Sequence, residues 1–211
     1  MRKLLLILAV IMPQPFKLFL YRRVMGWQIG AQVKIGLSYI DCDEVTLSDN
    51  VQIGHFNIVR CLRRFDVGSG SYIANFNQFF GNKYEDARWT RHLIVGEKVL
   101  FMSHHFVDVA GTVIIGSKTT VGGRDTQVWS HSLTYNQEIP DLAPMHVHIG
   151  EGAYIGARAT LVGCKIPDRA VVGAGSVVNK TFAPESCRLL IAGNPATIKK
   201  RYESTDSTEA S

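Results

Sequence analysis

Seven histidines are the residues of this sequence best suited to acid–base chemistry, because an imidazole titrates near neutral pH. They lie at positions 55, 92, 104, 105, 131, 146 and 148. His131 stands in the segment Gln127-Val-Trp-Ser-His131-Ser-Leu-Thr-Tyr135, where a regular repeat gives way to the longest irregular stretch. We therefore take His131 as a candidate general base. The alternative is a loop histidine that only hydrogen-bonds to backbone carbonyls.

A second polar cluster contains His104, His105 and Asp108, in Ser-His-His-Phe-Val-Asp. A carboxylate beside an imidazole fixes its tautomer and raises its basicity, so His105 with Asp108 is a candidate pair that supports the base or binds an acceptor. Residues three apart on an extended strand point to opposite faces, and the pair therefore needs a corner between them. The alternative is that both are surface polar residues.

Metal binding is a further possibility, because His146-x-His148 and His104-His105 offer ring nitrogens to zinc. The four cysteines, in contrast, lie far apart and form no Cys-x-x-Cys pair, at positions 42, 61, 164 and 187. This spacing argues against a zinc ribbon and a disulfide framework, and it favours a reducing cytosol.

The composition favours one globular domain. The chain has 211 residues, of which 46% are hydrophobic and 19% are charged, so disorder of the bulk and collagen-like repeats are excluded. Lys and Arg number 23 against 18 Asp and Glu, a net charge of +5. This mild excess suits an anionic small molecule or a membrane surface, and it is too diffuse to indicate nucleic-acid binding.

An aliphatic residue recurs every six positions through most of the chain, usually followed by Gly or another small residue. The repeat is clearest at Ile149, Ile155, Leu161, Ile166, Val172 and Val178, with one residue missing before Ile166. It appears upstream at Ile29, Ile35, Leu47, Ile53 and Val59, and again between Val67 and Val121. The phase breaks at residues 60–66, 80–94, 108–114 and 128–148, which we expect to be loop insertions.

A period of six fits neither a helix nor a single amphipathic strand. It predicts short strands separated by tight corners, each strand pointing one aliphatic side chain inward. Three such sides close a coil of about 18 residues, and stacked coils pair as parallel strands about 4.8 Å apart. A β-sandwich with glycine-rich turns is the alternative, but it predicts spacings of about 8–12 residues and strict alternation, which the sequence lacks.

The two ends of the chain differ from the repeat. Residues 1–26 open with two basic residues and nine apolar ones, fewer than the roughly 20 that span a bilayer. We expect a short apolar, helical segment that lies in a membrane interface or packs on its own domain or a partner subunit. Residues 27–182 are predicted to form the repeat domain with an insertion at 130–147, and residues 183–211 a C-terminal extension with a disordered tail.

The repeat resembles that of the hexapeptide-repeat acyltransferases over about residues 29–202. The resemblance is strongest where IGEGAYIGARATLVGCKIPDRAVVGAGSVVNK is followed by IAGNPATIKKRY, similar to the closing coils of galactoside, maltose and polysaccharide O-acetyltransferases. It implies an all-β fold, a left-handed parallel β-helix with a short N-terminal helical segment and a C-terminal extension. The hand comes from the resemblance alone, since the general crossover rule favours the right hand.

The resemblance also implies roles for individual residues. His131 matches the family's catalytic base, and some polysaccharide acetyltransferases pair a His-x-x-Asp, as in His105 to Asp108, with a downstream Trp-x-His, here Trp129 to His131. In Tyr72-Ile-Ala-Asn75-Phe-Asn77, Asn75 matches a residue that holds the acceptor or the developing oxyanion, and Trp129 is expected at the acceptor site. The alternative for Asn75 is an asparagine ladder between coils.

For the acyl donor, the resemblance implies a coenzyme A groove along the last coils. The expected contacts are Gly156, Ala157 and Ala174 for the pantetheine arm. Asn179, Lys180 and Lys200 are expected near the nucleotide end, although Asn179 replaces the family's threonine. The alternative for Lys199-Lys200-Arg201 is a solvated basic tail.

The predicted function is transfer of an acetyl group from acetyl-CoA to a carbohydrate hydroxyl by a homotrimer with active sites shared between subunits. We expect a cytoplasmic protein, peripheral to the inner face of the membrane if residues 1–26 bind lipid, with no metal and no nucleic-acid partner. Two other classes remain open. One is a zinc-dependent β-helix enzyme similar to carbonic anhydrases, although their His-x-x-x-x-His pairing is missing, and the other is a non-catalytic scaffold.

Overall fold

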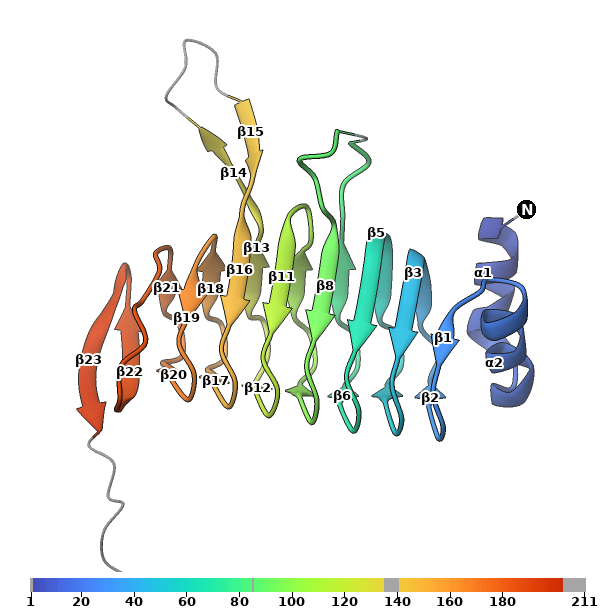
Figure 1. The fold of residues 1–211 in the computed structure, drawn as a ribbon, viewed down its shortest axis with the longest axis horizontal. Helices are drawn as coiled ribbons and strands as arrows, with labels where there is room; N and C mark the ends of the chain where they lie inside the picture. Colours follow the sequence, from blue (N-terminus) through green and yellow to red (C-terminus); the bar gives the residue numbers. More distant parts are fainter. Residues whose placement is uncertain (1, 85, 135–140, 203–211) are drawn as a thin grey trace, which may run out of the picture.

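The computed structural model describes residues 2–84, 86–134 and 141–202, and two helices followed by 23 strands make up its regular structure. Helices α1 (Arg2–Ile11) and α2 (Gln14–Arg23) close one end of an elongated stack of coils, and a β-hairpin closes the other (Figure 1). Among the described residues, no helix is long and apolar enough to cross a membrane.

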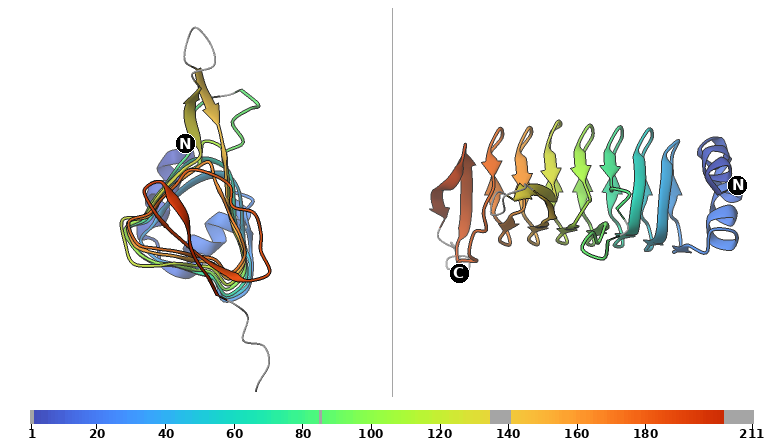
Figure 2. Two further views of the ribbon diagram at one scale, coloured as in Figure 1. Left: turned by 90° about the vertical axis from the view of Figure 1, so that its left-hand side faces the viewer. Right: turned by 90° about the horizontal axis from the view of Figure 1, so that it is seen from above.

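Seen along its long axis, the stack has a triangular outline, as Figure 2 shows. Three columns of parallel strands form its three faces. Face I contains β1 (Gln28–Ile29), the second half of β3 (Tyr39–Leu47) and of β5 (Ile58–Val67), β8 (His92–Val95), β11 (Thr112–Ile115), β16 (His146–Ile149) and β19 (Lys165–Ile166).

Face II follows in each coil and ends at the C-terminal hairpin. It contains β2 (Lys34–Ile35), β4 (Gln52–Ile53), β6 (Tyr72–Ile73), β9 (Leu100–Phe101), β12 (Thr120–Val121), β17 (Tyr154–Ile155), β20 (Val171–Val172), β22 (Arg188–Gly193) and β23 (Ala196–Tyr202). Strands β22 and β23 pair antiparallel with each other, whereas the other neighbouring strands of this face pair in parallel.

Face III completes each coil. It contains the first half of β3 and of β5, β7 (Gln78–Phe80), β10 (Phe106–Asp108), β13 (Gln127–Trp129), β18 (Thr160–Val162) and β21 (Val177–Val178).

The hexapeptide aliphatics form the core of the stack. Val95, Ile115 and Ile149 lie in register on three successive coils of face I and are almost fully buried. Since each such side chain contributes about 1.5–3 kcal/mol by leaving water, the column stabilises the fold collectively. The small residue after the aliphatic one is required by coil stacking: a Cβ on Gly116 would lie 2.5 Å from the amide nitrogen of Glu151.

The predicted fold class is confirmed, and two of the four expected loop insertions are wrong. Residues 108–114 contain only the short corner 109–111 between β10 and β11. Residues 60–66 form no loop but continue strand β5 around a corner, because the extended chain keeps its parallel pairing with β3 on both sides of that corner. The described parts of the other two stretches, residues 81–84, 86–91, 130–134 and 141–145, do leave the coil. In the second of these, β14 (His131–Thr134) and β15 (Asp141–Pro144) form an antiparallel arm.

Lys17 fastens the helical cap to the first coil. Its side chain is 2% exposed, and its Nζ donates hydrogen bonds to the carbonyl oxygens of Val10, Ile35 and Gly36 at 3.1, 3.2 and 2.8 Å. Burial lowers the pKa of Lys17. The end of α1, the start of α2 and the corner after β2 are therefore held by one ammonium group.

Candidate active site

The candidate site lies where face III passes into face I, which we call the III–I corner. Three successive coils turn there: β7 leads into the insertion 81–91, β10 into a short corner, and β13 into the β14–β15 arm. Both insertions project from the same edge of the stack (Figure 1). Arg88 of the first and Asp141 of the second form an exposed ion pair at 3.2 Å.

His131 and Asp108 form a hydrogen-bonded pair at this corner, with the imidazole Nδ1 2.8 Å from the carboxylate Oδ2. Strands β10 and β13 are neighbours with Val107 opposite Val128, so the last residue of β10 lies beside the end of β13 on the next coil. The Asp108 side chain is 11% exposed and that of His131 is 31% exposed. The carboxylate is thus sheltered while the ring stays open to a substrate.

Ser130 holds the carboxylate in place. Its backbone N–H donates to Asp108 Oδ2 at 2.9 Å, and its hydroxyl lies 2.8 Å from the Asp108 carbonyl oxygen and 3.0 Å from Oδ2. The same hydroxyl accepts the Gly111 N–H. The Asp108 side chain therefore has a fixed orientation toward His131.

This network assigns the His131 tautomer, because an ionised carboxylate only accepts hydrogen bonds. Nδ1 must carry the proton that it donates to Asp108. Nε2 of the neutral ring is then unprotonated and able to accept a proton from a substrate hydroxyl. A carboxylate that orients an imidazole in this way also stabilises the imidazolium that forms.

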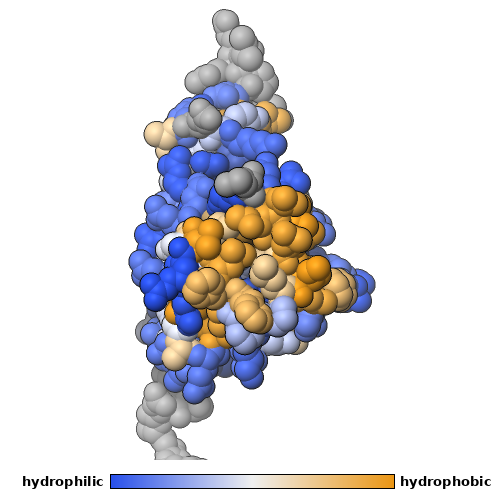
Figure 3. All heavy atoms as spheres, turned by 90° about the vertical axis from the view of Figure 1, so that its right-hand side faces the viewer, coloured by the Kyte–Doolittle hydropathy of each residue, from blue (hydrophilic) through white to orange (hydrophobic). Residues whose placement is uncertain are grey.

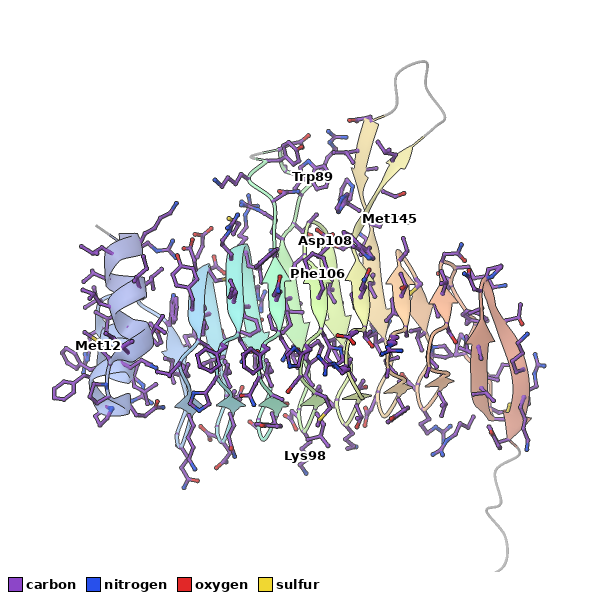
Figure 4. All side chains as sticks on the ribbon, turned by 180° about the vertical axis from the view of Figure 1, so that it is seen from behind. Met12, Trp89, Lys98, Phe106, Asp108 and Met145 are labelled. Carbon is purple, nitrogen blue, oxygen red and sulfur yellow. The ribbon has the colours of Figure 1, made fainter. Side chains whose placement is uncertain are left out.

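Aromatic rings flank His131 on two sides. The Trp129 ring centroid lies 6.1 Å and the Trp89 centroid 6.4 Å from that of His131, both edge-on. Trp129 also contacts Phe106, and the buried Trp89 contacts Tyr84. Figure 4 shows Trp89, Phe106, Asp108 and Met145 gathered at this corner. These rings restrict the imidazole and give the site partly apolar walls.

His105 does not pair with Asp108, contrary to the sequence expectation. Its side chain points into the stack and is 2% exposed, whereas Asp108 faces outward to His131. No corner separates the two residues, because residues 106–108 are strand β10.

His105 instead lies where face II passes into face III, which we call the II–III corner. It belongs there to a ladder of buried polar side chains. Its backbone N–H donates to Asn77 Oδ1 at 2.9 Å, and its Nδ1 accepts the Thr126 N–H at 3.1 Å. Asn57 and Ser38 continue the ladder toward the cap. Burial lowers the pKa of His105 to about 4.

Asn75 lies at the II–III corner and not beside His131. Its Oδ1 accepts the His55 N–H at 2.7 Å, and its own N–H donates to Ser103 Oγ. This is the ladder role that the sequence left open as an alternative. Asn75 and His131 can meet only if the II–III corner of a second subunit approaches the III–I corner of the first.

The predicted coenzyme A residues fall into separate groups. Gly156, Ala157 and Ala174 follow face II strands and line the II–III corner, where a Cβ on Gly156 would lie 2.6 Å from the Ala174 nitrogen. Coil stacking therefore explains this glycine without a ligand. Asn179 and Lys180 are exposed just after β21, on the same side of the stack as His131. Lys200 is exposed on β23.

Two aromatic contacts involve the lysines of the last coils. Lys180 Nζ lies 5.2 Å from the Phe182 ring centroid, and Lys200 Nζ lies 4.7 Å from that of Tyr202. Such contacts hold an ammonium on an exposed surface without neutralising it.

In the part of the chain that the structure describes, no three His, Cys, Asp or Glu residues gather in a metal-binding arrangement. His104 stacks on Phe76 with centroids 4.9 Å apart, and His146 and His148 lie two apart on β16. A zinc site built from these histidines therefore has no support within one subunit.

Two residues of the site were missed in the sequence. Ser130 lies between Trp129 and His131, and only the coil register shows that it contacts Asp108. Trp89 comes from a segment without any repeat. Its aromatic side chain in a mostly polar segment, six residues before the phase resumes at Val95, is the signal that could have pointed to it.

Comparison with known proteins supports the fold and the repeat. Residues 146–180 match a family model described as the hexapeptide repeat of succinyl-transferase. A segment of 87 residues, 41% of this chain, is 36% identical to serine acetyltransferase 4 of Arabidopsis thaliana and covers 23% of it. A second plant serine acetyltransferase is 34% identical over 101 residues, which are 30% of its length. The matched segments thus span less than a third of these curated relatives.

Solved structures resemble most of the chain. An N-acyltransferase from Bacillus cereus, AntD, in complex with dTDP and coenzyme A, has a TM-score of 0.53 and 17% identity, covering 92% of this chain and 91% of that one. The polysialic-acid-specific acetyltransferase NeuO has a TM-score of 0.52 and 16% identity, covering 87% of each chain. At this level of identity, the likeness shows the fold.

Residues 146–180 thus carry the hexapeptide repeat that the family model describes, and the chain as a whole shares the fold of these two acyltransferases.

Proposed function

We propose that this protein transfers an acetyl group from acetyl-CoA to a hydroxyl of a carbohydrate, with His131 as the general base. The observation that carries the proposal is the contact between His131 Nδ1 and the sheltered Asp108 carboxylate, which leaves Nε2 free on a partly open ring. This arrangement occurs in a fold that binds coenzyme A in AntD.

In the proposed reaction, Nε2 takes the proton of the acceptor hydroxyl as its oxygen attacks the thioester carbonyl. The tetrahedral intermediate collapses with cleavage of the C–S bond, and the imidazolium returns the proton to the departing thiolate. The products are an ester and free coenzyme A. Asp108 stabilises the transient imidazolium without taking its proton. No covalent enzyme intermediate is needed.

A carbohydrate acceptor suits the surroundings of His131. The half-buried ring of Trp129 provides apolar surface beside a base, which fits the mixed polar and apolar faces of a sugar ring. The name of one similar structure points to a carbohydrate acceptor, since NeuO is described as specific for polysialic acid. The serine acetyltransferase matches make the hydroxyl of L-serine a second acceptor to test.

We further propose that the active site is completed between subunits of a homotrimer. Asn75 and the small residues Gly156, Ala157 and Ala174 lie at the II–III corner, across face III from His131 and Lys180. A neighbouring subunit that docks this corner against the III–I corner would bring both sets to one groove. Acetyl-CoA would then contact the small residues of one subunit and Lys180 of the other.

The four cysteines are free in the structure, which fits the reducing cytoplasm that we propose as the setting.

The direct test is acceptor-dependent thiol release. Purified protein is incubated with acetyl-CoA or succinyl-CoA and with neutral oligosaccharides, sialic-acid oligomers or L-serine, and the product is identified by mass spectrometry. We expect thiol release with acetyl-CoA and a glycan, giving an O-acetyl ester. If the purified protein contains stoichiometric zinc and transfers no acyl group to any acceptor, the zinc-enzyme alternative is supported. If calorimetry detects no binding of acetyl-CoA, the scaffold alternative is supported.

Subunit complementation tests the shared site. Asn75→Ala and His131→Ala chains are each expected to be inactive alone. After joint refolding, mixed trimers contain interfaces that pair an intact His131 with an intact Asn75, so activity should return. If mixed assemblies form but remain as inactive as the parents, the two residues do not serve one site across an interface.

A further inference from the structure

The outer surface of the helical cap is strongly apolar. Six large hydrophobic side chains of α1 and α2 are between 44% and 75% exposed: Leu4, Ile7, Leu8, Ile11, Phe16 and Phe19. Figure 3 shows them as one continuous apolar area on the end of the molecule that the two helices cover. A patch of this kind on a water-soluble surface marks a place where something docks. We call it the cap patch.

Both sides of α1 are apolar, and this is unusual for a surface helix. Leu6 and Ala9 face the coils and are fully buried. Leu4, Ile7, Leu8 and Ile11 follow the i, i+3, i+4, i+7 spacing of a helix and face outward. The inner stripe is sufficient to attach the helix to the stack, so the outer stripe has no role in the fold of one chain.

The charged residues of the two helices are all basic, and of these Arg2 pairs with Asp41 of the first coil at 2.8 Å. Lys3 and Arg23 are exposed beside it, and Arg22 is exposed while donating to the carbonyl oxygens of Ile29 and Gly30. The sequence contains no Asp or Glu before Asp41. An apolar surface rimmed by cations fits the boundary between acyl chains and anionic headgroups.

A second copy of the chain fits this surface less well. Two cap patches placed end to end would bring the same Lys3, Arg22 and Arg23 side chains together, with no acidic residue of the cap to neutralise them. Such like-charge contacts oppose association. An anionic lipid surface pairs with the cations and buries the apolar side chains at the same time.

We propose that the cap patch docks the protein on an anionic lipid surface. The two helices lie in the interface plane without crossing the bilayer, in agreement with their ten residues each. Lys17 holds them to the first coil, so the coil stack rises from the membrane. Face III reaches from β3 on the first coil to β13 on the fifth, four spacings of about 4.8 Å, so the His131 corner stands about 19 Å beyond the first coil.

The test uses the full chain with vesicles of phosphatidylcholine alone or mixed with phosphatidylglycerol, in a sedimentation assay. We expect binding to the mixed vesicles, weaker binding to neutral ones and weakening by salt. Ile7→Asp with Phe19→Asp, and separately Lys3→Glu with Arg23→Glu, should each lower the partition coefficient at least tenfold. Leu100→Asp, which alters an exposed apolar residue of face II, is the control and should bind as the wild type does.

Circular dichroism and activity on a soluble acceptor show whether each variant stays folded, and they separate this proposal from the proposed reaction. Vesicle binding that survives in Ile7→Asp/Phe19→Asp would overturn the proposal. Failure of the wild-type protein to bind anionic vesicles would also overturn it. If the wild-type protein instead forms an assembly of twice the mass that Ile7→Asp/Phe19→Asp does not form, a second copy of the chain occupies the cap patch.

Discussion

Asp108 and His105 lie three residues apart yet serve opposite sides of the coil wall. Asp108 faces outward and accepts a hydrogen bond from His131 at 2.8 Å, while the His105 ring points inward and accepts the Thr126 N–H at 3.1 Å. Strand alternation determines this division. One carboxylate therefore belongs to the proposed chemistry, and one neighbouring imidazole belongs to the fold.

Replacing Asp108 by Asn should slow the reaction more than it weakens donor binding. An amide carries no negative charge to stabilise an imidazolium, and it can present N–H to Nδ1, which favours the wrong tautomer. We expect kcat to fall by roughly 10–100-fold or more, with the KM for acetyl-CoA little changed. Steady-state kinetics checks this, with Asp43→Asn as a control in an exposed carboxylate far from the site. A kcat that equals that of the control would remove Asp108 from the mechanism.

Trp89 should matter for the position of the His131 ring. Its indole is 3% exposed and contacts both Tyr84 and His131. Trp89→Ala removes this support and should lower kcat about tenfold, because small displacements of a base are costly. Trp89→Phe keeps an aromatic contact and should retain most of the activity. Equal activity of Trp89→Ala and the wild type would show that the ring has no positioning role.

His105 should make the fold sensitive to acid. Its pKa is lowered by burial to about 4 from an ordinary value of 6.5. Between these two pH values the unfolded chain therefore binds more protons than the folded one. The free energy of unfolding is unaffected by His105 above pH 6.5 and decreases as the pH drops toward 4. A difference of about 2.5 units corresponds to roughly 3 kcal/mol across this window.

Urea unfolding at several pH values checks the role of His105. In His105→Asn, an amide oxygen can still accept the Thr126 N–H, as Asn57 and Asn77 do for their neighbours. The variant should lose the part of the pH dependence that His105 contributes, while His146→Asn, on an exposed histidine, should keep the wild-type profile. A His105→Asn profile that parallels the wild type down to pH 4 would contradict the assignment.

Lys17 should be essential for the attachment of the cap. Lys17→Met keeps the buried methylene chain but removes the ammonium donor from three carbonyl oxygens. The Gly36 oxygen keeps the Ser38 N–H as a donor, and the loss costs about 1–3 kcal/mol for each of the Val10 and Ile35 oxygens that finds no other partner. We expect a lower urea midpoint and faster amide exchange in α1 and α2. Lys34→Met, in an exposed lysine of β2, is the control. Identical midpoints for the two variants would show that the hydrogen bonds of Lys17 do not stabilise the cap.

The sequence predicted the coil stack because the hexapeptide period directly reports an inward aliphatic side chain on each face. His131 was selected as a candidate because it follows the hexapeptide that begins at Val121 and lies at the start of the longest break in that period. Asp108 was among the predicted site residues but was paired with His105, since its direct contact with His131 depends on how many residues each corner takes between β10 and β13. The contact of Trp89 with His131 was not predicted for a related reason. The segment that contains Trp89 follows no period, and only the folded chain brings the two rings together.

The most direct test of the proposed mechanism compares wild-type protein with His131→Ala in acceptor-dependent release of coenzyme A. His148→Ala serves as a control in a half-buried histidine of face I. Removal of a general base should lower turnover by roughly 10²–10⁴-fold, while acetyl-CoA binding by calorimetry and the circular dichroism spectrum remain those of the wild type. Turnover of His131→Ala at the wild-type rate would contradict the central claim that this imidazole accepts the substrate proton.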